Sequence, residues 1–184
     1  MGIQRIVRAV RARLRAAFAV WRAPAVTERR LRGAPMRRVL VLCYGNIYRS
    51  AYLGAFLRQH VGADVEVRSA GFHAQAGRPS PARHVSMCQL RGVSLAEHRS
   101  RIVSPQDVEW ADTVVIMDRH NWLALDAMSA APEKLLWAGV LASGKPEISD
   151  PYGLDDTGAE RILARLEAAA QRLAGRLGNT RETV

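Results

Sequence analysis

The chain has 184 residues, of which 48% are apolar and 24% are charged. This composition supports one compact domain with its own core and excludes a disordered chain. Two cysteines are too few for a disulfide scaffold or for a zinc site of four thiolates. No apolar run in the sequence approaches the roughly 20 residues that span a bilayer.

The net charge of +10 is concentrated at the N-terminus. Residues 1–38 hold eleven arginines and a single acidic residue, Glu28. The rest of the chain therefore carries equal numbers of acidic and basic side chains. Because binding to a phosphate backbone needs a concentrated basic surface, this neutral main part excludes a nucleic-acid-binding core.

The first residues predict a basic amphipathic helix over residues 3–21. Apolar side chains recur there at helical spacing: Ile3, Val7, Val10, Leu14, Ala17 and Trp21. We expect Pro24 to end this helix and residues 27–35 to form a linker, so that residues 1–35 are an extension.

Such a helix can lie on an anionic membrane surface or dock on a partner. Two alternatives remain open from the sequence. An arginine-rich, acid-poor start also resembles an organelle transit segment. The chain could equally begin at Met36, directly before the first predicted strand.

The main domain, residues 36–178, alternates predicted strands with predicted helices and is followed by a C-terminal tail, residues 179–184. Strands are expected at residues 39–42, 64–69, 113–117 and 134–138, and helices at residues 50–60, 81–91, 105–110, 119–129 and 154–177. The first strand is apolar at every position, which is typical of a parallel sheet covered on both faces. The pattern predicts a single doubly wound α/β domain, in which ligands bind beyond the carboxyl ends of the strands.

The first strand runs directly into the loop Cys43-Tyr44-Gly45-Asn46-Ile47-Tyr48-Arg49-Ser50, and a helix follows. At a strand-to-helix turn, the amides between the cysteine and the arginine can point inward and form an anion-binding nest. Gly45 and Asn46 tolerate the positive φ angles that such a turn requires.

The side chains of this loop suit phosphate chemistry. The helix N-terminus favours a thiolate at Cys43, Arg49 can hold two phosphate oxygens, and Ser50 can donate a hydrogen bond to the sulfur. The plainer alternative is a buried structural cysteine beside an ordinary surface arginine.

A second motif, Asp150-Pro151-Tyr152-Gly153, precedes the last predicted helix. Alone it is an ordinary turn sequence. However, a cysteine that attacks a phosphate ester needs an acid to protonate the leaving oxygen, and a carboxyl group on a stiff proline-containing loop suits that task.

Together these two motifs resemble the low-molecular-weight protein-tyrosine phosphatase family. The likeness spans residues 36–177 and extends to Ser69-Ala70-Gly71, Gly92-Val93, His98-Arg99-Ser100-Arg101 and Met117-Asp118. Ala131-Pro132-Glu133 and Gly139 look most like a bacterial branch tied to exopolysaccharide export. The resemblance implies a four-stranded parallel sheet flanked by helices, with a phosphate-binding loop after the first strand.

The resemblance implies a phosphatase that needs no metal and no cofactor. Cys43 is the expected nucleophile, Arg49 binds the phosphate, Asp150 is the general acid, and Ser50 assists the thiolate as it leaves. The other loop residues expected around the phosphate are Tyr44, Gly45, Asn46, Ile47 and Tyr48.

Three further residues are expected to support this site. Ser69 and His98 would hold Asn46 by hydrogen bonds, and Tyr152 would flank the aromatic ring of the substrate. The resemblance also implies a phosphotyrosine protein as substrate, with the tyrosine-rich tail of a membrane tyrosine kinase as the leading candidate. This places the protein in the cytoplasm, with peripheral membrane contact through residues 3–21.

The sequence departs from the family pattern at two positions. Tyr48 stands where many members have a second cysteine, which puts reversible oxidation in doubt, and Ala51 stands where many have proline.

Two other functions remain as alternatives. A thiol-dependent arsenate reductase would need further cysteines near the third strand, where this chain has only Cys88 well upstream. A non-catalytic phosphate-binding module would result if Tyr48 blocked the pocket.

Overall fold

A four-stranded parallel sheet lies at the centre of the molecule, in the order β2-β1-β3-β4. The computed structural model describes residues 2–178, and of residues 2 and 3 only the backbone; the predicted tail, residues 179–184, lies outside the described residues. The strands are β1 (Arg38–Cys43), β2 (Glu66–Gly71), β3 (Thr113–Ile116) and β4 (Leu135–Trp137). The predicted α/β class with four parallel strands is confirmed.

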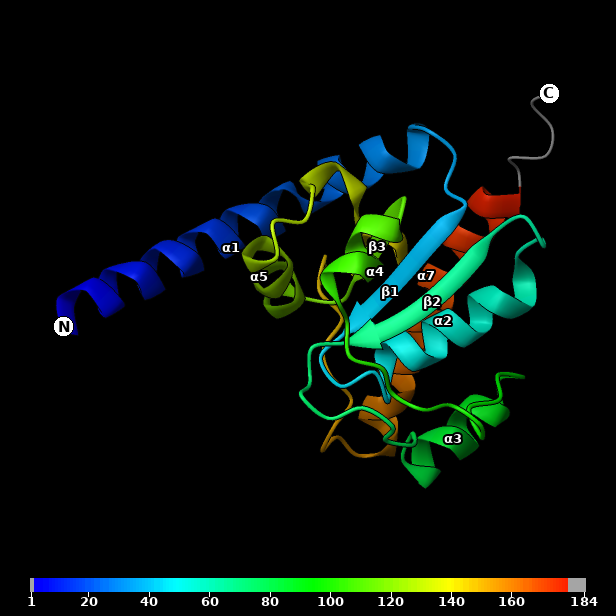
Figure 1. Ribbon diagram of the computed structural model, residues 1–184. Helices are drawn as coiled ribbons and strands as arrows, with labels where there is room; N and C mark the ends of the chain where they lie inside the picture. The colour runs from blue at the N-terminus through cyan, green and yellow to red at the C-terminus, as the bar shows by residue number, and fades with distance from the viewer. Residues whose placement is uncertain (1, 179–184) are drawn as a thin grey trace.

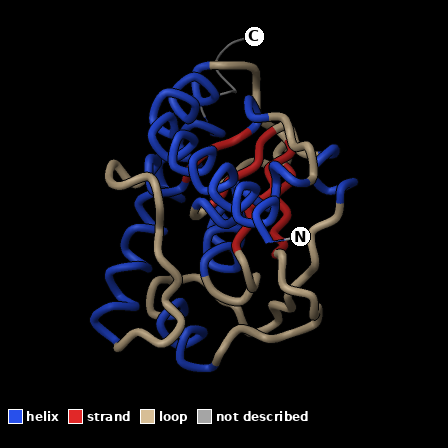
Figure 2. The backbone as a smooth tube through the Cα atoms, turned by 90° about the vertical axis from the view of Figure 1, so that its left-hand side faces the viewer, coloured by secondary structure: helices blue, strands red, loops and turns tan. Residues whose placement is uncertain are grey.

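Helices pack on both faces of the sheet, so that the strands form a middle layer (Figures 1 and 2). They are α1 (Gly2–Arg32), α2 (Arg49–His60), α3 (Ala82–Gln89), α4 (Pro105–Trp110), α5 (Arg119–Ala127), α6 (Ala138–Leu141) and α7 (Asp156–Gly178), with a 3₁₀ turn, η1 (Pro132–Lys134). The helices predicted in the main domain are all present. Only α6 and η1 were not predicted, because they are too short to show a helical period in the sequence.

Strand β1 divides the core into two halves because successive side chains point to opposite faces. Val39 and Val41 pack in the cluster that includes the buried residues of α2 and α7. Leu40 and Leu42 pack in the other cluster, with residues of α1, α4 and α5. Burial on both faces is why this strand is apolar throughout.

Helix α1 is longer than the sequence predicts. Pro24 was expected to end it and residues 27–35 to form a linker, but the helix continues through Pro24 to Arg32. A proline inside a helix costs about 3 kcal/mol, because it removes a hydrogen bond and crowds the preceding turn. Here Ala23 and Thr27, on either side, are both fully buried against the domain. Their packing offsets the penalty that local sequence rules assign to Pro24.

The second half of α1 is part of the α/β domain. Its buried side is made of small residues and one leucine: Ala16, Ala23, Thr27 and Leu31. The hydroxyl of Thr27 accepts a hydrogen bond from the backbone N–H of Trp137, at the end of the edge strand β4 (3.1 Å). Glu28 forms an ion pair with Arg172 of α7 (2.6 Å).

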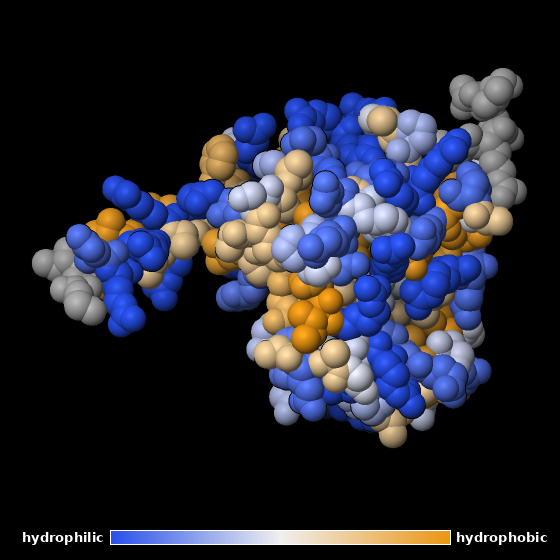
Figure 3. All heavy atoms as spheres, viewed as in Figure 1, coloured by the Kyte–Doolittle hydropathy of each residue, from blue (hydrophilic) through white to orange (hydrophobic). Residues whose placement is uncertain are grey.

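The first half of α1 extends beyond the body of the domain (Figure 1). The large apolar side chains of this half, Ile6, Val7, Val10 and Leu14, are exposed, and so are Phe18 and Trp21 at the start of the second half. At 100° per residue, this stripe lies roughly 120° around the helix axis from the docked side. Figure 3 shows apolar and hydrophilic atoms mixed along this free segment. The predicted apolar stripe therefore does not face the core.

This arrangement predicts different effects for two truncations. Removing residues 1–35 uncovers the surface beneath Ala23 and Leu31, and should lower the free energy of unfolding by about 2 kcal/mol or more, since burying one leucine is worth about that much. Removing residues 1–14 leaves the docked half in place and should change it little. Urea denaturation of the three proteins measures this. Equal stability of all three would show that α1 does not stabilise the domain.

Candidate functional site

The predicted site residues meet at the carboxyl edge of the sheet. Cys43 is the last residue of β1, Arg49 is the first residue of α2, and Asp118 follows β3 as the N-cap of α5. Since parallel strands end at one edge, residues that are far apart in sequence come together there.

The loop between Cys43 and Arg49 has its carbonyl groups tied from outside. The carbonyl of Tyr44 accepts hydrogen bonds from two amides that follow β2, and that of Gly45 accepts one from Arg78 (2.6 Å). His98 Nε2 lies 2.7 Å from the carbonyl oxygen of Asn46. Because C=O and N–H point in opposite directions across a trans peptide, these bonds turn the following amides inward. The loop thus forms a cradle in which the backbone N–H of Asn46 donates to the Cys43 sulfur.

Asn46 sits at the tightest point of the loop, with a positive φ of 52°. Its side chain donates to the Ser50 hydroxyl (2.9 Å) and accepts from the backbone N–H of Arg101 (2.9 Å). Asn46 thus supplies the positive φ that the turn requires, and Gly45 does not adopt one. One expectation was wrong here. Ser69, in β2, makes no hydrogen bond to Asn46 among the described residues, and Arg101 takes the place expected for it.

Cys43 has a buried side chain whose sulfur receives two polar contacts. The Ser50 hydroxyl lies 3.0 Å from Sγ, and the backbone N–H of Asn46 donates to Sγ over 3.2 Å. Donors of this kind stabilise negative charge on sulfur.

Arg49 is the most enclosed charged residue of the site, with 2% of its surface exposed. Its Nη1 donates to Asp118 Oδ2 (2.6 Å) and to the carbonyl of Ile148 (3.0 Å), and its Nη2 donates to Asp150 Oδ2 (2.5 Å). Its Nε is buried without a hydrogen-bond partner in the structure. A buried donor without a partner is costly, so Nε is available for an oxygen atom of a ligand.

The charge on Arg49 is secured by its neighbours. Burial alone would lower the pKa of its guanidinium, but Cys43, Asp150 and Asp118 offset this and raise the pKa of Arg49 above its ordinary value. Arg49 thus remains a cation that faces the sulfur and both carboxylates.

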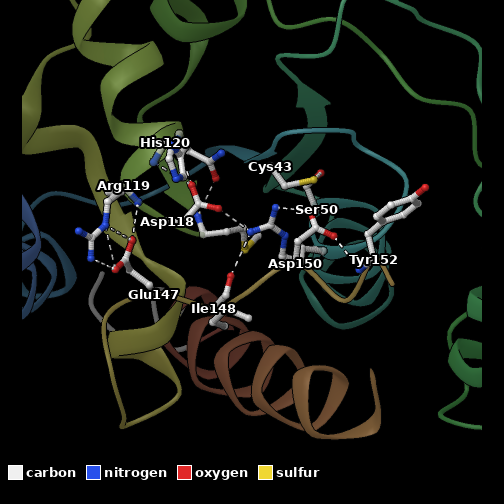
Figure 4. A network of polar contacts seen from close by, with 12 residues as sticks. Cys43, Ser50, Asp118, Arg119, His120, Glu147, Ile148, Asp150 and Tyr152 are labelled. Atoms are coloured by element: carbon white, nitrogen blue, oxygen red, sulfur yellow. Dashed lines mark hydrogen bonds and ion pairs between the residues drawn. The ribbon is translucent and has the colours of Figure 1, made fainter. Parts of the chain in front are cut away.

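Asp150 and Tyr152 lie on the loop before α7, and Figure 4 shows both of them near Cys43. Asp150 Oδ1 accepts the backbone N–H of Tyr152 (3.0 Å), which leaves Oδ2 on Arg49. The ring of Tyr152 is 77% exposed and stands at the rim of the site.

A pocket of about 410 Å³ opens over Cys43, Asp150 and Tyr152, with Arg49 outside its lining. Its walls come from three segments of the chain, and the lining residues are Cys43, Tyr44, Gly45, Ile47, Tyr48, His73, Arg78, Asp150 and Tyr152. Tyr48, the residue expected to interfere, packs its ring against His84 at a centroid distance of 4.8 Å, and the pocket remains open beside it. The described residues contain no group of three or more His, Cys, Asp or Glu that could hold a metal ion.

Several residues of the site were not assigned a role from sequence; besides Arg78 and Arg101, they include Asp118 and Gly71. Asp118 holds Arg49, and its position directly after a buried strand was the available signal. Gly71, at the end of β2, allows the loop to approach the strand. A Cβ atom there would lie 2.6 Å from the carbonyl oxygen of Tyr44 and 2.9 Å from the amide of Asn46.

An inward-facing amide loop with a cysteine at its start, an arginine at its end and a carboxylate opposite defines the cysteine-dependent phosphatases as a class. Among families of this class, residues 38–183 match the model of the low molecular weight phosphotyrosine protein phosphatases. This chain belongs to that family.

Similarity to individual proteins supports the membership of this chain in the family. The low molecular weight protein-tyrosine-phosphatase Etp of Escherichia coli is 32% identical over 142 residues, which is 76% of this chain and 93% of that protein. The probable phosphatase EpsP of Ralstonia nicotianae is 32% identical over 135 residues, 72% of this chain and 90% of that protein. The YwlE arginine phosphatase of Geobacillus stearothermophilus has a similar structure, with a TM-score of 0.70 and 26% identity over 79% of this chain and 95% of that one.

The environment of His84 predicts how stability depends on pH. His84 is buried behind the loop, with Nε2 3.3 Å from the carbonyl oxygen of Tyr48. Burial lowers its pKa to about 4. Between about pH 6.5 and 4 the unfolded chain binds a proton at this residue that the folded protein does not, so stability should fall as pH falls. The loss from pH 7 to pH 5 should be about 2 kcal/mol.

Chemical denaturation at several pH values measures this slope, and His84→Gln should flatten it by about that amount. His98 contributes to the slope in the same direction, since burial lowers its pKa as well. It remains in the variant, so the difference between the two slopes isolates His84. An identical slope in both proteins would contradict the assignment.

Proposed function

We propose that this protein hydrolyses phosphotyrosine in proteins through a phosphocysteine at Cys43. The observation that carries the proposal is that one loop begins at Cys43, whose sulfur receives two polar contacts, and ends at Arg49, whose buried Nε has no hydrogen-bond partner. A phosphate group that entered this cradle would satisfy Nε and the inward amides, and its phosphorus would face Sγ.

In the first step the Cys43 thiolate attacks phosphorus, and the bond from phosphorus to the phenolic oxygen breaks. Arg49 and the loop amides hold the three equatorial oxygens. The leaving phenolate takes a proton from Asp150. In the free protein Asp150 is paired with Arg49, and a bound phosphate offers Arg49 another pair of oxygens. Substrate binding would thus release the carboxyl group to carry the proton.

In the second step a water molecule attacks the phosphocysteine, and Asp150 removes its proton. The S–P bond breaks, phosphate is formed, and the sulfur returns as a thiolate. Ser50, at 3.0 Å from Sγ, donates a hydrogen bond to the sulfur as negative charge develops on it.

The pocket favours an aryl phosphate over a phosphoguanidine. Tyr44, Ile47 and Tyr152 offer ring and aliphatic surface to a phenyl group. A guanidinium would need several hydrogen-bond acceptors, but the carbonyls of Tyr44, Gly45 and Asn46 are tied outward. The alternative of an arsenate reductase is not supported, because the second cysteine, Cys88, is held as a thiol. Burial raises the pKa of Cys88 to about 12.

For the physiological substrate we propose the tyrosine-rich tail of a membrane tyrosine kinase of exopolysaccharide export, which places the protein in the cytoplasm at the inner membrane face. The support is the likeness to that branch and the free half of α1, whose exposed apolar stripe runs among arginines. None of the helices in residues 2–178 is long and apolar enough to cross a bilayer. The proposed contact is therefore peripheral.

The role of Asp150 predicts a loss that depends on the leaving group. Asp150→Ala should lower kcat by about 10²–10⁴ with a phosphotyrosine peptide. The loss should be much smaller with p-nitrophenyl phosphate, whose phenolate leaves without a proton. Steady-state kinetics on both substrates measures this, and Cys43→Ser should be inactive on both.

Asp156→Ala is the matched control, because Asp156 is an exposed carboxylate that pairs with Arg83 at the start of α7. It should leave both rates unchanged. If Asp150→Ala lowered kcat equally for both substrates, Asp150 would have a structural role and would not protonate the leaving group. Faster turnover of phosphoarginine than of phosphotyrosine would contradict the substrate class.

The proposed membrane contact predicts binding to anionic vesicles. Each cation near an anionic bilayer is worth roughly 1 kcal/mol, and the attraction is screened over about 8–10 Å at physiological salt. The full chain should sediment with phosphatidylglycerol vesicles, and less so as salt rises. A chain without residues 1–14 keeps its docked helix but loses four arginines and most of the exposed stripe, so a smaller fraction of it should sediment. Equal sedimentation of both would contradict this role of α1.

A further inference from the structure

A second groove, of about 410 Å³, lies between α1, α5 and β4, and it shares no residue with the catalytic pocket. Its floor and sides are mostly apolar. The lining residues are Arg15, Phe18, Ala19, Arg22, Val26, Arg29, Trp122, Asp126, Pro132, Leu135 and Trp137. The volume is within the range of small-molecule sites.

Three arginines edge this groove at a spacing of seven residues, which places them along one side of α1. Arg15 is neutralised by an ion pair with Asp126 (2.5 Å). Arg22 and Arg29 are exposed and have no carboxylate partner among the described residues. The guanidinium of Arg22 lies over the ring of Phe18, 5.8 Å from its centroid. The groove therefore combines an apolar floor with two uncompensated cations on its edge.

We propose that this groove binds an acyl chain of an anionic phospholipid, with the lipid phosphate on Arg22 and Arg29. Arginine is suited to hold two phosphate oxygens at once, and Trp122 and Leu135 give the chain an apolar surface. The groove also continues the exposed stripe of α1, because Phe18 belongs to both.

A peptide strand fits the groove less well. A strand that paired with the sheet edge would need free backbone groups there, but the backbone N–H of Trp137 already donates to Thr27. The apolar floor would leave the polar backbone of such a peptide without partners, which is costly. An acyl chain carries no such groups. This inference does not depend on the catalytic activity, since none of the lining residues belongs to the proposed machinery.

Isothermal titration with monomeric dihexanoyl-phosphatidylglycerol tests the proposal on the full chain. We expect saturable binding, and dihexanoyl-phosphatidylcholine, which has the same chains without net charge, should bind at least tenfold more weakly. The double variant Arg22→Gln/Arg29→Gln should raise the Kd for the anionic lipid at least tenfold. Both positions are exposed, so the variant should fold normally, and its unchanged hydrolysis of p-nitrophenyl phosphate or unchanged circular dichroism would verify this.

The matched control is Arg8→Gln/Arg11→Gln, which removes the same charge from the free half of α1, outside the groove. It should leave the Kd unchanged. Equal weakening by both double variants would show a diffuse charge effect and overturn the site. Equal affinity for the two lipids, or no binding of either below its micellar concentration, would overturn it as well.

Discussion

The buried guanidinium of Arg49 is the interaction on which the site depends. It joins three segments that are far apart in sequence: the start of α2, Asp118 after β3, and the loop that carries Ile148 and Asp150. Because the Arg49 side chain is buried, removing it would leave the Asp118 carboxylate, the more enclosed of its two acidic partners, without compensation. The same contacts occupy Nη1 and part of Nη2, and leave Nε for a ligand. Arg49 thus holds the three segments of the site together and also has a free N–H donor for the phosphate.

The phosphate loop is the second element of this arrangement, and it is ordered from outside. Its carbonyls are held by the backbone after β2, by Arg78 and by His98, and so its amides turn toward the sulfur. The loop can approach β2 because Gly71 has no side chain there. Donors fixed in this way need no reorganisation when charge develops on the substrate, which is the basis of electrostatic catalysis.

The local part of the site could be predicted from sequence, because strand, loop and helix start are contiguous between Cys43 and Ser50. The long-range contacts could not. The bond from Arg101 to Asn46 and the ion pair between Arg49 and Asp118 depend on how separate segments meet. Helix α1 shows the same limit. Local rules end it at Pro24, whereas tertiary packing of Ala23 and Thr27 carries it through to Arg32. Which side of α1 is buried likewise depends on its contacts with β4 and α7. The hydrophobic periodicity of the sequence does not reveal these contacts.

The most direct test of the account is to trap the covalent intermediate. The full chain would be mixed with a ³²P-labelled phosphotyrosine peptide, denatured at alkaline pH during turnover, digested, and analysed for the labelled peptide. We expect one alkali-stable, acid-labile label, on the peptide that contains Cys43, and none in Cys43→Ala. Turnover without a labelled cysteine, or a label on any other residue, would contradict it.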